Sequence, residues 1–157
     1  MSFVFNLLEL PVEPHGMETA PPGHEFSGAS LTERVDAVLT GHSVYELPPG
    51  QKGWPYHFEL GEEEWLIVIA GEVVVRTPAG ERTLRAGDAA CFPAGADGAH
   101  AMRNDGDVTA RFAMPSAAPG RVDVAVYPDS GKIKVSGRGF ERRFELGDER
   151  GYWEGEP

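Results

Sequence analysis

Two short segments of this chain contain residue types that bind divalent metal ions. The first segment holds His57, Glu59 and Glu64, and the second holds His100. Imidazole nitrogens and carboxylate oxygens are common protein ligands of first-row metals such as Mn(II), Fe(II) and Zn(II). Because His57 and Glu59 are two residues apart, a strand projects both side chains to the same face. These four residues are the candidate metal ligands, and no residue is assigned a catalytic role.

The residues after Glu64 predict how that carboxylate is positioned. Residues 65–70 are apolar and lead directly to a turn at Gly71 and Glu72. Such a run, bounded by a turn signal, is typical of a buried strand. Glu64 is therefore expected at the start of a strand that belongs to the core.

Short β-strands are predicted on both sides of the candidate ligands. Residues 42–47 alternate polar and apolar side chains and end at a Pro-Pro-Gly turn. Further strands, separated by Gly, Pro, Asp and Asn, are predicted at 65–69, 73–77, 81–84, 89–92, 99–103, 108–114 and 122–127. Many short strands at this spacing indicate a sandwich or a jelly roll.

The chain is predicted to have three parts: an N-terminal arm and lead-in segment at 1–41, a β-barrel at 42–127, and a turn with a charged and aromatic tail at 128–157. Several prolines before residue 30 favour an extended arm over a packed element. Residues 31–39 fit both helical and strand spacing, and their structure stays open. Phe140 and Phe144 are either neighbours on a helix that docks the tail or exposed parts of a flexible end, and we favour partial docking.

Composition narrows the classes of partner. The chain has 157 residues, enough for one domain with its own core. Its 14 basic and 25 acidic residues give a net charge of −11, which argues against nucleic acid and anionic membrane surfaces as partners. No apolar run is long enough to span a bilayer, so a soluble cytoplasmic protein is expected. The single cysteine, Cys91, is predicted to be a buried small hydrophobe, and His15 and His24 are predicted to be solvated.

The candidate ligands lie within two motifs that resemble those of the cupin superfamily. The first motif is matched by Gly50, His57, Glu59, Glu64 and Gly71. The second motif is matched by Gly87, Pro93, Gly95, His100 and Asn104. Two of the gaps are longer than usual, but both lie in loops, where insertions cost little. The resemblance spans residues 42 to 127 and includes both motifs in the expected order.

The resemblance implies an all-β fold, the cupin double-stranded β-helix or jelly-roll barrel, here with an extended N-terminal arm. It also implies a metal site, in which Glu59 replaces the second histidine of the first motif. The site then has two histidines and two glutamates, a set that favours Mn, Fe or Zn over Cu. Without a metal, the same residues would form a polar cluster that binds a ligand directly, and one glutamate would keep a proton.

Three functions remain open. The first is a metal-dependent enzyme acting on a small molecule, as a dioxygenase, isomerase or decarboxylase. The second is a protein that binds or senses a small metabolite such as a sugar or an acid without catalysis. The third is a cupin whose metal site has degenerated. In each case the expected assembly is a homodimer, with the N-terminal arm as a candidate exchanged element. The substrate is left unassigned, because a fold does not determine a function.

Overall fold

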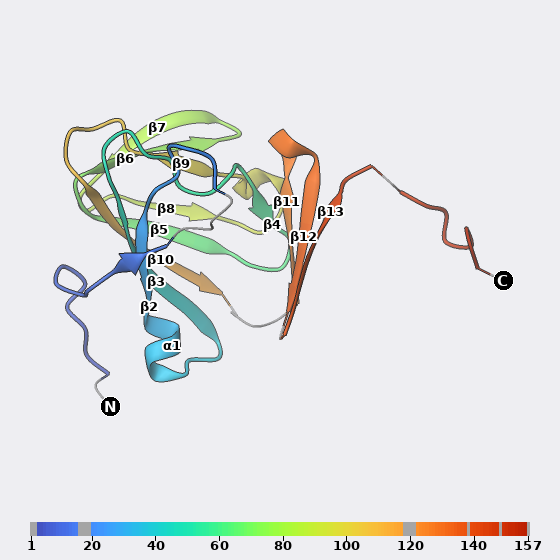
Figure 1. Cartoon of the computed structure of the whole chain (residues 1–157), viewed down its shortest axis with the longest axis horizontal. Coiled ribbons are helices and arrows are strands. Elements are labelled where there is room, and N and C mark those ends of the chain that lie inside the picture. The colour runs from blue at the N-terminus through green and yellow to red at the C-terminus, as the bar shows by residue number, and fades with distance from the viewer. Residues whose placement is uncertain (1–2, 16–19, 118–121, 138, 148, 157) are drawn as a thin grey trace.

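The computed structural model describes residues 3–15, 20–117, 122–137, 139–147 and 149–156. Its strands form three antiparallel sheets (Figure 1). The six-stranded sheet has the order β1-β2-β3-β10-β5-β8. In that order its strands span Glu13–Pro14, Ser27–Ser30, Thr40–Leu47, Ala110–Ala117, Glu64–Ala70 and Ala89–Phe92. The three-stranded sheet has the order β7-β6-β9, from Gly80–Arg85, Glu72–Thr77 and Ala101–Arg103.

The four-stranded sheet has the order β13-β12-β11-β4, from Phe140–Glu145, Lys132–Gly137, Asp123–Tyr127 and Phe58–Glu59. It stands at one side of the barrel, and the C-terminal residues run away from it (Figure 1). One short helix, α1 (Leu31–Val35), precedes β3, and 3-10 turns cover Ala96–Gly98 and Pro128–Ser130. Residues 31–39, whose sequence fits both helical and strand spacing, therefore begin with a helix.

The main core is built by inward-facing side chains of the six-stranded and three-stranded sheets. Leu66 and Val68 on β5 are buried, whereas the alternate residues Trp65 and Ile67 are exposed. This alternation is expected for a strand with one face on the core. Phe112 on β10 is among the largest buried side chains of the same cluster. The all-β barrel is thus confirmed, and the strands predicted between residues 42 and 127 are all present, with ends shifted by a few residues at most.

The N-terminal arm packs on the barrel, contrary to the prediction of an unpacked arm, because β1 and β2 join the six-stranded sheet. Leu10 is buried in a second core cluster with Val44 and Ala113. The guanidinium of Arg111 donates hydrogen bonds to the carbonyl oxygens of Leu7 and Leu10. These contacts fix the arm across β3 and β10.

Three local predictions were wrong. Phe140 and Phe144 lie on strand β13, which pairs antiparallel with β12, rather than on a docked helix or a flexible end. Cys91 is exposed, because it alternates with the buried Phe92 on edge strand β8. His24 is half-buried, and its Nδ1 lies 2.7 Å from the carbonyl oxygen of Gly53.

Asn104 ties the loop after β9 to the core. Its side chain is fully buried and its Nδ2 donates hydrogen bonds of 2.8 Å to the carbonyl oxygens of Leu47 and Val108. Its Oδ1 accepts a hydrogen bond of 2.9 Å from the amide of Gly106. The second motif thus ends on a residue with a structural role.

We expect Asn104→Ala to lower the free energy of unfolding by about 2 to 3 kcal/mol, because it leaves buried backbone groups unpaired. Asp107→Ala, a change at an exposed position of the same loop, should alter it by less than about 0.5 kcal/mol. Urea unfolding in the presence of a chelator measures both values. Equal effects of the two substitutions would show that the buried amide does not hold the loop.

Candidate metal centre

A backbone bridge brings the two histidines of the site together. The amide of His100 donates to the carbonyl oxygen of His57 at 2.8 Å, and the amide of His57 donates back at 3.1 Å. Residues paired in this way place their side chains on the same face. The two imidazole rings are 4.8 Å apart between centroids. His57 and His100, separated by 42 residues in the sequence, are therefore neighbours as a direct result of strand pairing.

Both imidazoles are held in the same tautomer. The Nδ1 of His57 lies 2.9 Å from the carbonyl oxygen of Pro55, and the Nδ1 of His100 lies 2.9 Å from that of Gly98. A carbonyl oxygen only accepts hydrogen bonds, so each Nδ1 carries the proton and each Nε2 presents a lone pair. Burial lowers the pKa of both histidines to about 4, so both rings are neutral at pH 7.

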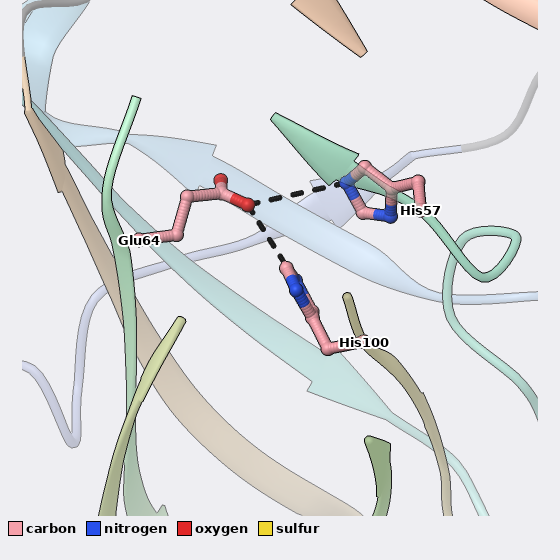
Figure 2. A group of neighbouring side chains, drawn as sticks. All are labelled: His57, Glu64 and His100. Carbon is pink, nitrogen blue, oxygen red and sulfur yellow. Dashed lines mark ion pairs between the residues drawn. The ribbon is translucent and has the colours of Figure 1, made fainter. Parts of the chain in front are cut away.

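Glu64 completes a group of three acceptors. Its Oε2 lies 3.5 Å from Nε2 of His100 and 3.9 Å from Nε2 of His57 (Figure 2). The ligand atoms of these residues all lie within 4.8 Å of one another. Glu64 Oε2 and His100 Nε2 are buried without a hydrogen-bond partner. Two lone pairs and a carboxylate with no donor between them require a cation or a proton, and this donor set fits a divalent metal.

Glu59 lies beside this group but outside it. Its Oε1 is 3.6 Å from Nε2 of His57, and its Oε2 is buried without a partner. Burial, together with a hydrogen bond with the Asp123 carboxyl, raises the pKa of Glu59 to about 9. The Asp123 side chain is itself fixed by the amide of Gly61, which donates to its Oδ1 at 2.8 Å. The structure thus gathers three of the four predicted ligands, and places the fourth at their edge.

Glu64 is the part of the group that solvent reaches. Its side chain is 20% exposed, against 1% for His100. Burial, together with the charge of Glu62, raises the pKa of Glu64 to about 7. In the metal-free protein near neutral pH, a proton on this carboxyl is the alternative to a cation.

Several residues that support the site were not identified from the sequence. The ring of Phe92 stacks on His100 at 3.7 Å between centroids, and Tyr127 stacks on His57 at 5.5 Å. Gly98 leaves no room for a side chain, because a Cβ there would lie 1.9 Å from the carbonyl oxygen of Pro93. The spacing of Gly98 within the second motif could have suggested such a role, whereas the stacking contacts depend on tertiary packing.

The fold and the site together define a small jelly-roll barrel protein with a candidate metal centre inside the barrel. Residues 43–115, which include all four predicted ligands, match the family model of the cupin domain. The barrel of residues 43–115 is therefore a cupin domain. The resemblance found in the two motifs is thus confirmed.

Solved structures share this fold over most of the chain. A protein from Acidithiobacillus ferrooxidans, provisionally named a sugar phosphate isomerase, is 24% identical with a TM-score of 0.80, over 92% of this chain and 90% of its own. A sugar phosphate isomerase from Silicibacter pomeroyi is 22% identical with a TM-score of 0.77, over 90% and 92% of the two chains. A predicted oxalate decarboxylase from Thermotoga maritima is 23% identical with a TM-score of 0.60, over 73% and 98%.

No curated protein sequence matches the chain. Within the described residues, the one helix is far too short to cross a bilayer.

We expect the metal-free protein to be most stable in mildly acidic solution. The folded-state pKa values of Glu64 and Glu59 are raised, so their favourable contribution is complete below about 4.5 and is lost as the pH rises through about 7 and about 9. The folded-state pKa values of His57 and His100 are lowered, so their contribution is present above about 6.5 and is lost as the pH falls through about 4.

Urea unfolding in a chelator from pH 4 to pH 10 should therefore show a maximum between about pH 5 and 6.5. The Glu59→Gln/Glu64→Gln variant should lose most of the decline on the alkaline side, because neither amide ionises. An unchanged alkaline decline in that variant would mean that the two carboxyls are not the groups responsible.

Proposed function

We propose that this protein is a divalent-metal-dependent enzyme acting on a small, oxygen-rich, anionic molecule. One observation carries the proposal: two neutral imidazoles in a fixed tautomer and a buried carboxylate converge with no donor among them. Backbone carbonyls that fix Nδ1–H are the usual outer partners of metal-binding histidines. A polar cluster that only binds an organic ligand would be expected to include a hydrogen-bond donor of its own.

The proposed ligands are His57, Glu59, Glu64 and His100. The group of His57, Glu64 and His100 already supplies two histidines and one carboxylate. Glu59 would complete the set by a small movement of its side chain toward His57. A bound metal would polarise a substrate oxygen, and open coordination positions would admit that oxygen. Mn, Fe and Zn each suit this mixture of nitrogen and oxygen ligands.

The residues of the chain contribute binding and proton handling. Glu64 lies at the solvent-facing side of the group, which is where a substrate would approach. Glu59 is the carboxyl that a second acid, Asp123, holds by a hydrogen bond. It is therefore the group best placed to carry a proton to or from a bound substrate.

Lys134 supports an anionic substrate. Ala125 pairs with Glu59 on one side and with Lys134 on the other, so the three side chains share one face of the four-stranded sheet. Burial dominates the pKa shifts of Glu59 and Glu64 and raises both, and the positive charge of Lys134 partly opposes that increase, so its field reaches the site. The positive charge of Lys134 would attract a substrate carboxylate or phosphate.

The proposed ligand set predicts the number of protons that metal binding releases at pH 7. Metal ligands must be deprotonated, and the histidines are already neutral. With pKa values of about 7 for Glu64 and about 9 for Glu59, wild-type protein should release about 1.5 protons per Zn(II) if both bind. Glu59→Gln should release about 0.5.

Titration calorimetry in buffers with different ionisation enthalpies measures this number. Glu64→Gln and His100→Ala should abolish stoichiometric binding, while Glu63→Gln, at an exposed neighbouring position, should leave it unchanged. If Glu59→Gln releases as many protons as the wild type and binds equally well, Glu59 is not a ligand.

The proposed function also predicts that the metal-loaded protein turns over a substrate. The names of the similar structures suggest two sets of compounds to test, namely sugar phosphates and small dicarboxylates such as oxalate. Protein loaded with Mn(II), Fe(II) or Zn(II) should isomerise or decarboxylate a member of one set, as followed by NMR in deuterated water. His100→Ala should lower kcat/KM by at least about 1,000-fold, because a lost ligand removes the metal.

Water-proton relaxation of the Mn(II)-loaded protein provides an independent check. Enhanced relaxation that falls when substrate is added would show exchangeable positions on the metal. A fully metallated protein without exchangeable water would refute an enzymatic role for this centre.

A further inference from the structure

The four-stranded sheet has one polar and one apolar face. Its strand register places Glu59, Ala125 and Lys134 in one row on the face that holds the candidate metal centre. The neighbouring row of paired residues projects to the opposite face. In this row Val126 pairs with Phe58 on one side and with Ile133 on the other, and Ile133 pairs in turn with Phe144. We define the outer apolar face by the residues that share this orientation: Phe58, Val124, Val126, Ile133, Val135, Phe140 and Phe144.

No layer of the described chain covers this face. None of its seven residues is buried, and none belongs to either core cluster. Phe140 is 47% and Phe144 is 50% exposed, and all six residues of β13 are exposed. The hairpin of β12 and β13 projects from the side of the barrel, with β11 as its neighbour in the sheet (Figure 1). Pairing with β11 supports one edge of the hairpin, but its outer apolar side chains stay open to solvent in the single chain.

The size of the outer apolar face matches one half of a dimer interface. At about 200 Å² for an exposed aromatic side chain, the two phenylalanines of β13 expose roughly 200 Å² together. Leu60 and Val122 extend the face at its edges and are 54% and 75% exposed. The total is roughly 500 to 600 Å² per copy, above the few hundred Å² of a typical monomer patch. A standard interface of roughly 800 Å² per partner needs a similar apolar share.

Charge favours a second copy of this chain as the partner. Residues 132–145 contain five of the 14 basic residues of the chain but only two of the 25 acidic ones. The hairpin is therefore basic, while the remainder of the molecule is strongly acidic. When two copies meet through this sheet, the hairpin of each is attracted by the acidic body of the other. On the outer apolar face itself, Arg142 is the one charged residue of the four strands, so like charges do not oppose the contact.

We propose that the outer apolar face is the subunit interface of a homodimer, in which the sheets of two copies pack face to face. Such a contact is self-complementary and closes by a two-fold axis. Two sheets packed about 10 Å apart would bury their facing side chains as in a β-sandwich. The interface lies on the opposite side of the sheet from the candidate metal centre, so dimerisation does not depend on metal.

Light scattering coupled to size-exclusion chromatography tests the proposal, in chelator and with Zn(II). The wild type should have about twice the chain mass of 17.0 kDa in both conditions. Phe140→Ser/Phe144→Ser should run as a monomer, with the dimer dissociation constant raised at least about 100-fold. The matched control is Val38→Ser/Leu39→Ser, which removes apolar side chains that are 75% and 70% exposed elsewhere and should remain dimeric.

Two results would overturn the proposal. One is a wild type that stays monomeric at about 100 µM, which would assign the face to a different protein. The other is a folded Phe140→Ser/Phe144→Ser variant that remains dimeric.

Hydroxyl-radical footprinting of the wild type covers the case in which that variant does not fold. Oxidation of Phe140 and Phe144 should increase on dilution, in proportion to the monomer fraction. Equal oxidation of both residues in dimer and monomer would place the interface elsewhere and contradict the proposal.

Discussion

The candidate centre depends on a shortage of hydrogen-bond donors. Two imidazoles direct lone pairs at a carboxylate, and the usual donors of a buried polar cluster are absent from the group. Each Nδ1–H is already used by a backbone carbonyl two residues earlier in the chain. Such an arrangement is unfavourable when the space between the acceptors is empty, and it becomes favourable when a cation or a proton occupies it.

The barrel supplies the rigidity that this arrangement requires. The backbone bridge between His57 and His100 fixes the separation of the rings, and Phe92 and Tyr127 restrict their tilt by stacking. Glu64 starts a strand whose alternate residues fill the core, so its carbonyl and Cα cannot shift without disturbing that packing. The packing of the barrel thus defines the geometry of the centre.

The four-stranded sheet links the centre to the surface of the molecule. One face presents Glu59, Asp123 and Lys134 to the site, and the other presents a continuous apolar surface. Both faces belong to the same strands, so one sheet serves the candidate metal centre on one side and the proposed interface on the other.

The sequence by itself determined the class of fold and selected the residues of the candidate site. Period-two alternation and regularly spaced turn residues depend on local geometry, and they identified the strands from residue 42 to 127 and the barrel. Motif spacing selected His57, Glu59, Glu64 and His100, and three of these converge.

Only the tertiary structure decided the histidine tautomers, the position of Glu59 at the edge of the group, and the strand conformation of residues 132–137 and 140–145. Each of these depends on contacts between residues distant in the chain, or on a carbonyl whose direction follows from packing. Phe140 and Phe144 show the difference: a separation of four residues fits both a helix and a strand, and pairing with β12 selected the strand.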